Sequence, residues 1–281
     1  MAKIVFRDPS TADLIVEHSV TAWHVSEETE FQQVDVFETV EFGMTLALGG
    51  VINVTERDEM GYHEMLAHVP LLAHPNPRRV LIIGGGDGGT LREVVKHPSV
   101  EEAVMVEIDE FVVDVSKKYL PGCASAFEDP KANLIIGDGL AYVRDAADDS
   151  FDVILVDSTD PVDAAVELFT PEFYADCKRV LADGGILVPQ SDSVQLYPDR
   201  VAKIAGSLRE IYDRVDFYLT FVPTYPGTVW SFAFAVTGET DCRRVDMERY
   251  EAIEGSLRYY TPELHRAAFA LPRTYSVVVG K

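Results

Sequence analysis

A glycine-rich loop at residues 84–89, in which Asp87 is the only residue that is not glycine, is the segment that most clearly points to chemistry. It follows an apolar run at 80–83 and precedes a helix-like segment at 90–95. Strand, glycine turn and helix bind nucleoside cofactors, because glycines let the backbone approach the ligand and the helix N-terminus offers free N–H groups. Asp87 would repel a pyrophosphate or a ligand carboxylate. The loop therefore predicts a nucleoside ligand with a cationic tail.

The spacing of the glycines also matches a dinucleotide site. Gly84, Gly86 and Gly89 satisfy the dinucleotide fingerprint, and Glu107 follows about 20 residues later, at a predicted strand end. An acid at that position hydrogen-bonds ribose hydroxyls in a dinucleotide or in an adenosyl compound. Spacing alone does not separate the two ligands, and Asp87 argues for the adenosyl compound.

Further carboxylates follow the next predicted strands. Asp138, between Gly137 and Gly139, can accept from the exocyclic amine of adenine, although an aspartate beside glycine is also an ordinary turn former. Asp157 and Asp160 lie three residues apart at the end of the following strand. In doubly wound sheets the carboxyl ends of the strands carry the ligand site. Acids at consecutive strand ends therefore predict a negatively charged cleft, and the bland alternative is a set of helix caps and turns.

The elements that position these acids alternate between strand and helix patterns. Alternation of this kind predicts an α/β fold with a mostly parallel, doubly wound sheet. Its predicted strands are 80–83, 103–107, 134–136, 151–157 and 185–190, with later, antiparallel edge strands at 216–222 and 230–236, and its predicted helices are 91–96, 110–119, 141–146 and 171–180.

The N-terminal part has a different pattern. Segments 33–38, 44–48 and 51–54 are short strands joined by tight turns, which predicts a small antiparallel sheet. Asp58 is a candidate cap for a helix that presents one apolar face and ends at Pro75 and Pro77. We therefore divide the chain into an N-terminal β-strand domain (1–56) and a catalytic α/β domain (57–281).

Composition restricts the partners. The 281 residues carry a formal net charge of −23, which disfavours nucleic acid and anionic membranes. No apolar run reaches the roughly 18 residues of a membrane helix, and no secretory signal is predicted. The charge fits a soluble or salt-adapted protein as well as a cleft that attracts a cationic substrate, and it does not decide between them.

Metal sites and disulfides are not expected. Cys123, Cys177 and Cys242 are odd in number and far apart, which predicts reduced thiols in a cytoplasmic protein and no cysteine metal site. His63 and His68 resemble a zinc-protease motif, but they are separated by one residue more than in that motif. With this spacing the two side chains do not lie on the same face of a helix, so a zinc site is not expected.

Several motifs in order resemble one family. They are residues 55–59, 62–65, the glycine loop, 106–109, 157–161 and 222–226, within a similarity from about residue 31 to residue 271. The chain is similar to the polyamine aminopropyltransferases, most of all to the spermidine synthases among them. This resemblance implies an N-terminal β-domain joined to a Rossmann-like (class I methyltransferase-like) domain.

The resemblance also implies a co-substrate, decarboxylated S-adenosylmethionine, with no permanently bound cofactor and no metal. Asp87 matches the residue that pairs with its free amine, Glu107 the ribose acid and Asp138 the adenine acid. Gln32 matches a glutamine on the cofactor side. The residues implied to bind the co-substrate are Gln32, Gly84, Gly86, Asp87, Glu107, Asp138 and Gly139.

Catalysis is implied to rest on Asp157 and Tyr62. A primary amine with a pKa near 10.4 is mostly protonated at neutral pH and cannot attack. A carboxylate at Asp157 first binds this cation and then accepts its proton, and Tyr62 aligns the nitrogen. The neutral amine displaces methylthioadenosine from the propyl carbon. The residues implied to bind the amine substrate are His63, Asp87, Asp157, Asp160, Gln190, Asp192 and Tyr225.

Departures from the family pattern bear on the acceptor. Residues 162–167 replace a Gly-Pro-rich gate loop, and Gly49 and Asn53 replace an aspartate and a glutamine near the acceptor end. The expected acceptor is the diamine putrescine, giving spermidine, with agmatine, cadaverine or another amine as alternatives. An S-adenosylmethionine-dependent diamine N-methyltransferase is the main rival. A polyamine sensor and a nicotinamide oxidoreductase are disfavoured by Asp157 and Asp87 respectively. The resemblance also implies a homodimer or homotetramer.

Overall fold

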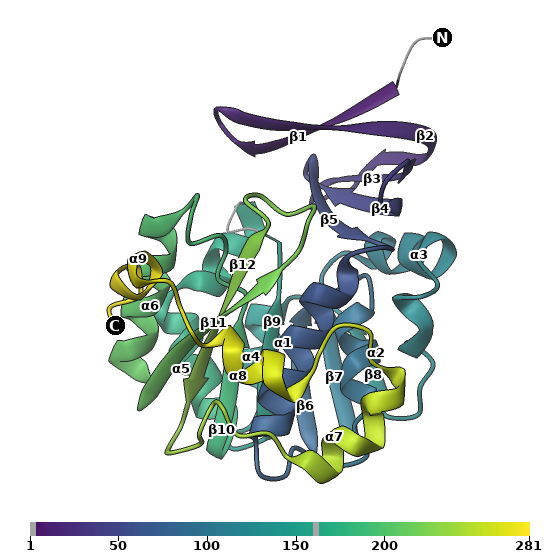
Figure 1. Cartoon of the computed structure of the whole chain (residues 1–281). Coiled ribbons are helices and arrows are strands. Elements are labelled where there is room, and N and C mark those ends of the chain that lie inside the picture. The colour runs from purple at the N-terminus through teal and green to yellow at the C-terminus, as the bar shows by residue number, and fades with distance from the viewer. Residues whose placement is uncertain (1–3, 160–162) are drawn as a thin grey trace.

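The computed structural model describes residues 4–159 and 163–281, which form two sheets (Figure 1). The smaller sheet has five antiparallel strands in the order β1-β2-β3-β4-β5. The larger sheet has seven strands in the order β11-β12-β10-β9-β6-β7-β8. The predicted fold class, an antiparallel β-unit followed by a Rossmann-like sheet, is confirmed.

The small sheet packs its two faces differently. Its strands are β1 (Ile4–Thr11), β2 (Leu14–Glu28), β3 (Gln33–Thr39), β4 (Gly43–Leu48) and β5 (Val51–Thr55). Val34 and Val36 alternate with Phe37 along β3, so one set packs on helix α3 (Glu110–Tyr119) and the other on Phe6 of β1. The long β1–β2 hairpin forms the outer edge of the small sheet (Figure 1), and near its turn the carbonyl oxygen of Ser10 accepts from the Tyr197 hydroxyl of the loop after β10.

The large sheet is parallel except at one edge. Its strands are β6 (Arg79–Gly84), β7 (Glu102–Glu107), β8 (Ala132–Ile136), β9 (Phe151–Asp157), β10 (Leu181–Pro189), β11 (Arg214–Phe221) and β12 (Val229–Val236). Strands β6 to β10 pair in parallel, and β12 and β11 add antiparallel strands beside β10. This agrees with the sequence prediction, including the antiparallel edge. The carboxyl ends of β6, β7 and β9 therefore meet at one edge of the sheet, which is where the acids follow.

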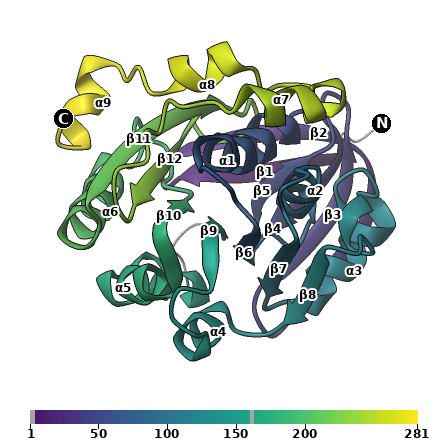
Figure 2. The same cartoon turned by 90° about the horizontal axis from the view of Figure 1, so that it is seen from below.

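Helices cover both faces of the large sheet (Figure 2). Helices α1 and α2 pack on one face, and α4, α5 and α6 on the other. The helices besides α3 are α1 (Glu59–Ala73), α2 (Gly89–Val95), α4 (Gly139–Asp145), α5 (Pro171–Val180), α6 (Pro198–Ile211), α7 (Met247–Ile253), α8 (Pro262–Ala268) and α9 (Arg273–Val278), with short 3-10 turns at Ala124–Ala126, Asp163–Phe169 and Glu254–Ser256.

Helix α1 differs from its prediction in two respects. It is buried nearly all round rather than on one face, because the large sheet, helix α2 and the C-terminal segment enclose it. Asp58 occupies the N-cap position but makes no capping bond. Its carboxylate instead accepts from Thr55 Oγ1 at 2.6 Å and from Thr224 N at 2.9 Å. Asp58 thus ties the start of α1 to the loop after β11.

The C-terminal segment closes over α1 (Figure 1). The carboxylate of Glu64 accepts the backbone N–H groups of residues 258, 259 and 260 at 2.7–2.9 Å. These bonds bring Arg258 against the first turn of α1, where it pairs with Glu59. None of the helices in the described part of the chain combines the length and the hydrophobicity that a membrane span requires.

Candidate active site

A cavity of about 290 Å³ lies between the two sheets, at the carboxyl ends of β6, β7 and β9. Residues from β4, β5 and the turn between them close its far side. The cavity brings together most of the residues that the sequence singled out. Those that line it are Gln32, Tyr62, His63, Gly84, Gly86, Asp87, Glu107, Asp138, Gly139, Asp157, Gln190 and Tyr225.

The glycine loop lies directly against the end of β9. Gly85 N donates to the Asp157 carbonyl oxygen at 2.8 Å, and Gly84 has a φ of +81°. A Cβ on Gly84 would overlap that same carbonyl oxygen. The following turn brings Asp87 to the N-terminus of α2, where its Oδ1 accepts from Gly89 N at 2.7 Å. The loop therefore depends on glycine both for its dihedral angles and for its close approach to Asp157.

We expect Gly84→Ala to lower the free energy of unfolding by about 2–5 kcal/mol. The left-handed conformation costs roughly 1–2 kcal/mol with a side chain, and overpacking adds about 1–3 kcal/mol. Gly50 is a matched control, because its φ is +83° and nothing lies within 4 Å of its added Cβ. Gly50→Ala should carry only the dihedral cost. Urea unfolding of both variants measures the difference, and equal losses would contradict the packing argument.

Asp157, at the end of β9, is a cavity carboxylate that accepts from two hydroxyl groups. Its Oδ2 accepts from Thr90 Oγ1 at 2.6 Å, and Tyr62 donates to the same carboxylate. Carboxylate oxygens of Asp87 and Asp157 and a ring nitrogen of His63 all lie within 4.8 Å of one another. Burial and the negative charge of Asp87 raise the pKa of Asp157, and His63 opposes that rise. Burial and Asp157 also raise the pKa of Tyr62 well above its usual range, so Tyr62 is a donor here.

Glu107 and Asp138 occupy the ends of the neighbouring strands. Glu107 accepts from Gly86 N at 3.1 Å and from Asp109 N at 2.8 Å, and burial raises its pKa to about 7. Asp138 caps helix α4 by accepting from Leu140 N at 2.9 Å, and it lines the cavity as well. The helix-cap and ligand interpretations of Asp138 are therefore compatible. Gln32 reaches the same end of the cavity and donates to Asp109 at 3.3 Å.

The other end of the cavity joins the two sheets. The Tyr225 hydroxyl donates to the Asn53 carbonyl oxygen at 2.5 Å, and its ring lies 5.6 Å from that of Tyr62. Gln190 donates to the carbonyl oxygens of residues 158 and 159 at 3.4 Å. Trp230, which the sequence suggests as a core or channel-wall residue, also lines this end. An elongated ligand can therefore extend from the glycine loop towards the small sheet.

Asp192, one of the expected substrate residues, is not among the described residues that line this cavity. Asp192 is buried, accepts from Ser193 N at 2.6 Å and forms an ion pair with Arg200 of α6. Its charge is already paired, so its position does not support the expected contact with a substrate ammonium. Asp160 lies outside the described residues, as does residue 162 of the segment expected to form a gate.

The fold and the cavity define a class of protein: a Rossmann-like α/β protein with a cavity ringed by carboxylates at the carboxyl ends of its parallel strands. Residues 59–244 match the family model described as the spermine/spermidine synthase domain, and residues 4–56 match the spermidine synthase tetramerisation domain. The chain belongs to the spermine/spermidine synthase family. It is a transferase of polyamine biosynthesis, and the match to the tetramerisation domain supports an oligomer.

Individual relatives agree with this family. A polyamine aminopropyltransferase from Desulforudis audaxviator (strain MP104C) is 46% identical over 268 residues, covering 95% of this chain and 96% of the relative. One from Thermoanaerobacter sp. (strain X514) is 46% identical over 249 residues, covering 89% and 88%. A crystal structure of spermidine synthase in complex with the transition state analogue AdoDATO has a TM-score of 0.95 at 38% identity, covering 99% of this chain and 95% of that one. Spermidine synthase from Thermotoga maritima has a TM-score of 0.94 at 38% identity, covering 100% and 95%.

Proposed function

We propose that the protein transfers the aminopropyl group of decarboxylated S-adenosylmethionine to putrescine, giving spermidine and 5'-methylthioadenosine. The observation that carries this proposal is the pair Asp87 and Asp157 inside a nucleoside-type cavity. Two close carboxylates favour cationic amines and disfavour a ligand that carries its own carboxylate. The similar spermidine synthase that binds AdoDATO supports the same assignment.

The proposed co-substrate site uses the acids at the strand ends. Glu107 accepts from the ribose hydroxyls, Asp138 accepts from the adenine amine, and Asp87 pairs with the free amine of the propyl chain. Gln32 closes the nucleoside side. Glycines 84, 86 and 139 keep the backbone close to the ligand in this proposal.

The proposed reaction is a direct displacement. Asp157 holds the acceptor ammonium and then takes one of its protons, and the raised pKa of this carboxyl suits a base. The neutral nitrogen forms a bond to the propyl carbon while the carbon–sulfur bond breaks, and the electron pair leaves on sulfur. Tyr62 aligns the nitrogen, and His63, Gln190 and Tyr225 line its approach. The leaving thioether is neutral, so the step needs neither a metal nor an acid for the leaving group.

An end-point assay read by mass spectrometry tests the proposal. The enzyme is given decarboxylated S-adenosylmethionine with putrescine, cadaverine, agmatine, 1,3-diaminopropane or spermidine, and a parallel set contains intact S-adenosylmethionine. Formation of methylthioadenosine and spermidine from putrescine supports the proposal. A larger product yield with another amine would identify that amine as the preferred acceptor. A methylated amine from the parallel set, without aminopropyl transfer, identifies the diamine N-methyltransferase instead.

The affinity for methylthioadenosine should fall as the pH is lowered below 7. The ribose hydroxyls donate to an ionised Glu107, whose pKa of about 7 in the free protein means that lower pH neutralises it before binding. Each pH unit below that value should weaken binding up to about tenfold. Calorimetry between pH 8 and pH 5.5 measures the slope, and Glu107→Gln should bind more weakly with a flat profile. A flat profile in the wild type would remove Glu107 from the ribose contact.

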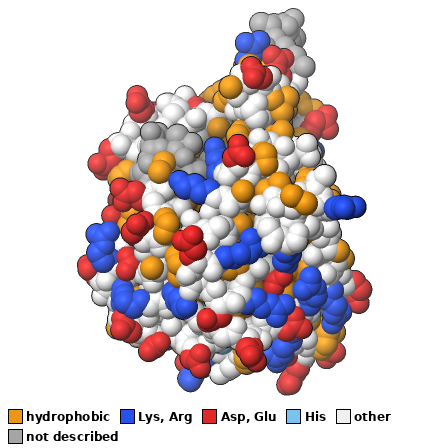
Figure 3. Space-filling view, turned by 90° about the vertical axis from the view of Figure 1, so that its left-hand side faces the viewer, with side chains coloured by type: hydrophobic (Ala, Val, Ile, Leu, Met, Phe, Trp, Pro, Cys, Tyr) orange, Lys and Arg blue, Asp and Glu red, His pale blue; other side chains and the backbone are white. Residues whose placement is uncertain are grey.

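We further propose a homotetramer assembled through the β1–β2 hairpin. Apolar side chains on this hairpin are exposed, including Ile4, Ile15 and Trp23, and hydrophobic side chains gather on the projection at the top of Figure 3. Exposed apolar strands of this kind favour pairing between copies. Light scattering after size exclusion separates tetramer, homodimer and monomer, and a monomer would overturn the proposal.

A cytoplasmic location is part of the same proposal. Cys123, Cys177 and Cys242 are free and buried. Unpaired thiols are typical of reducing compartments. Fractionation of the source cells, followed by immunodetection of the chain, tests the location.

A further inference from the structure

The strongest unexplained cluster lies behind His63, on the side away from the glycine loop. Glu59 and His63 are one turn apart on α1, and His63 Nδ1 lies 2.7 Å from Glu59 Oε2. The other ring nitrogen, Nε2, lies 3.3 Å from Asp87 Oδ1. The side chains of Glu59 and His63 are only 2% and 3% exposed. The imidazole is thus held between two carboxylates, one of which faces the cavity.

Glu59 does not line the cavity that contains Asp87 and Asp157. It borders a second hollow of about 370 Å³, together with Arg92 and Arg258. Arg92 Nη2 donates to Glu59 Oε2 at 2.8 Å, and Arg258 pairs with Oε1. Glu59 therefore reaches the cavity only through His63, and two guanidinium groups from distant elements hold it in place.

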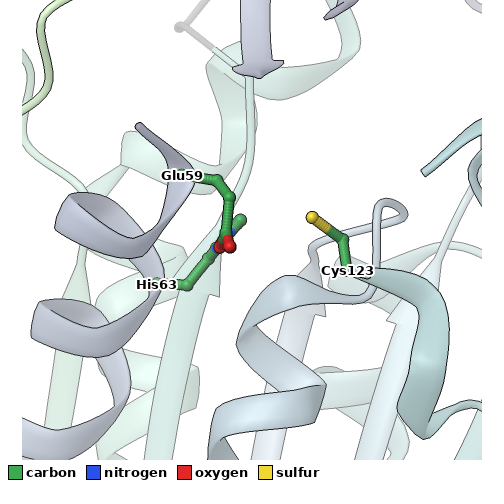
Figure 4. A group of neighbouring side chains, drawn as sticks. All are labelled: Glu59, His63 and Cys123. Carbon is green, nitrogen blue, oxygen red and sulfur yellow. The ribbon is translucent and has the colours of Figure 1, made fainter. Parts of the chain in front are cut away.

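A cation site is the obvious alternative for this cluster. Figure 4 shows Glu59 and His63 extending from the same helix, with the Cys123 thiol across the gap, and ligand atoms of all three lie within 4.8 Å of one another. Arg92 and Arg258 already occupy both carboxylate oxygens, and their charges oppose a metal ion. Burial, together with the charges of Asp87 and Glu59, also raises the pKa of Cys123 well above its usual range, which disfavours the thiolate. The cluster therefore favours a network of ion pairs, formed by Glu59 with His63, Arg92 and Arg258, over a metal site.

We propose that Glu59 is a positioning residue, which holds His63 with its Nε2–H on Asp87 and so fixes Asp87 for the cationic group of the ligand. Asp87 Oδ1 faces both His63 Nε2 and Gly89 N. Among the described residues, Oδ2 is left for the ligand amine. A carboxylate bonded to one ring nitrogen fixes the direction of the ring and hence of the N–H on its other nitrogen.

Charges around the imidazole favour its protonated form. Burial alone would lower the pKa of His63, but Asp87 and Glu59 more than offset it and raise that pKa well above its usual value. Asp157 is the other charged group near the ring on the cavity side, and the Tyr62 ring packs edge-on at 5.5 Å. On the opposite side lie Arg92, Arg258 and the Cys123 thiol.

Glu59 itself stays ionised. Burial would raise its pKa, but His63 and Arg92 lower it to about 2. The protonated imidazole and this carboxylate form a neutral pair, which can steer Asp87 without strongly repelling a cationic ligand. The predicted effect of Glu59 on turnover rests on the function proposed above. The predicted protonation state of His63 in the free protein does not depend on that function.

Glu59→Gln tests the proposal, because glutamine keeps the size and removes the charge. In ¹⁵N spectra of the unliganded protein, His63 of the variant should lose its imidazolium proton at a lower pH than His63 of the wild type, because Asp87 remains but Glu59 no longer contributes its charge. In assays, the KM for decarboxylated S-adenosylmethionine should rise by about 10–100-fold, as for other carboxylates that orient a histidine. The kcat should change by less than about threefold, since the lost contact acts on binding.

The pH dependence separates positioning from a loss of stability. Lowering the pH restores the imidazolium of His63 in Glu59→Gln, so the ratio of its KM to that of the wild type should fall towards one. The titration of Glu107 changes both KM values alike and cancels in this ratio. Asp216→Asn is a matched control: Asp216 is a buried carboxylate of β11 paired with Arg214 and Lys281, and it does not line the cavity. It should lower the melting temperature and leave the His63 signal and the KM unchanged.

Two results would overturn the inference. One is a His63 titration in Glu59→Gln that coincides with that of the wild type, and the other is an equal rise of KM in Asp216→Asn. If the wild type transfers no aminopropyl group to any amine, the proposed function fails by itself. The His63 spectra then still decide whether Glu59 sets the state of the imidazole.

Discussion

Asp157→Asn should cut turnover by at least about 10²-fold while methylthioadenosine binds nearly as in the wild type. General-base catalysis typically contributes about 10²–10⁴-fold, and an amide cannot accept the proton of the attacking amine. Asparagine is isosteric and retains an acceptor for Thr90, so the structural role of the side chain is largely preserved. Single-turnover rates measure the chemical step, and calorimetry with methylthioadenosine measures binding.

The pH profile of this variant provides the control. Without the carboxylate, the attacking amine must lose its proton to solvent, so turnover should recover as the pH approaches the amine's own pKa. The wild-type rate should already be near its plateau at lower pH. Turnover like that of the wild type at pH 7.5 in Asp157→Asn would remove this residue from the mechanism.

Asp87→Asn should reduce the preference for decarboxylated over intact S-adenosylmethionine by at least about 10²-fold. Two unit charges 4 Å apart interact by about 4 kcal/mol at an effective dielectric constant of 20, which corresponds to about 10³-fold in affinity. The charge attracts the free amine of one ligand and repels the carboxylate of the other. Removing it weakens the first complex and strengthens the second, so the ratio changes more than either affinity.

Calorimetry with both ligands measures this ratio directly. Asparagine can still accept from Gly89 N and from His63 through its side-chain oxygen, so the loop should keep its conformation. Methylthioadenosine has no amine or carboxylate on this arm and should bind Asp87→Asn as it binds the wild type. An unchanged ratio of the two affinities would contradict the assignment of Asp87 to the propyl amine.

The large sheet could be predicted because its signals are local. Each core strand is a short apolar run followed by a turn, and parallel strands bring their carboxyl ends to one edge whatever the intervening loops. That rule placed Asp87, Glu107, Asp138 and Asp157 together from the sequence, and all four line the cavity.

Other elements carry weaker signals. The β1–β2 hairpin has several exposed apolar residues, including Ile15 and Val16, so its pattern does not alternate cleanly and its length was not predicted. Helix α6 and the helices after β12 were not identified either. Asp58 was expected to cap α1, but threonines on both sides of the junction take its carboxylate instead.

The pairings between distant residues could not be predicted from spacing. Arg200 neutralises Asp192 from the following helix, and nothing in the sequence distinguishes this aspartate from one that awaits a ligand. Arg258 pairs with Glu59 across 199 positions of the chain. Thr90 reaches Asp157 across 67 positions. Such contacts depend on how the sheets and the tail pack, which a local pattern does not encode.

The attachment of the C-terminal segment to α1 limits how this enzyme can be recombined. Glu64 binds three successive backbone N–H groups of that segment, and the neighbouring arginine completes the charges behind the imidazole. The tail is therefore not an interchangeable appendage. Consider a chimera that combines this protein with the C-terminal segment of a relative. It keeps these contacts only if the relative's segment follows the same backbone path past Glu64 and carries an arginine at the position of Arg258. Exchanges between relatives therefore have to take helix α1 and the segment at residues 258–260 from the same parent.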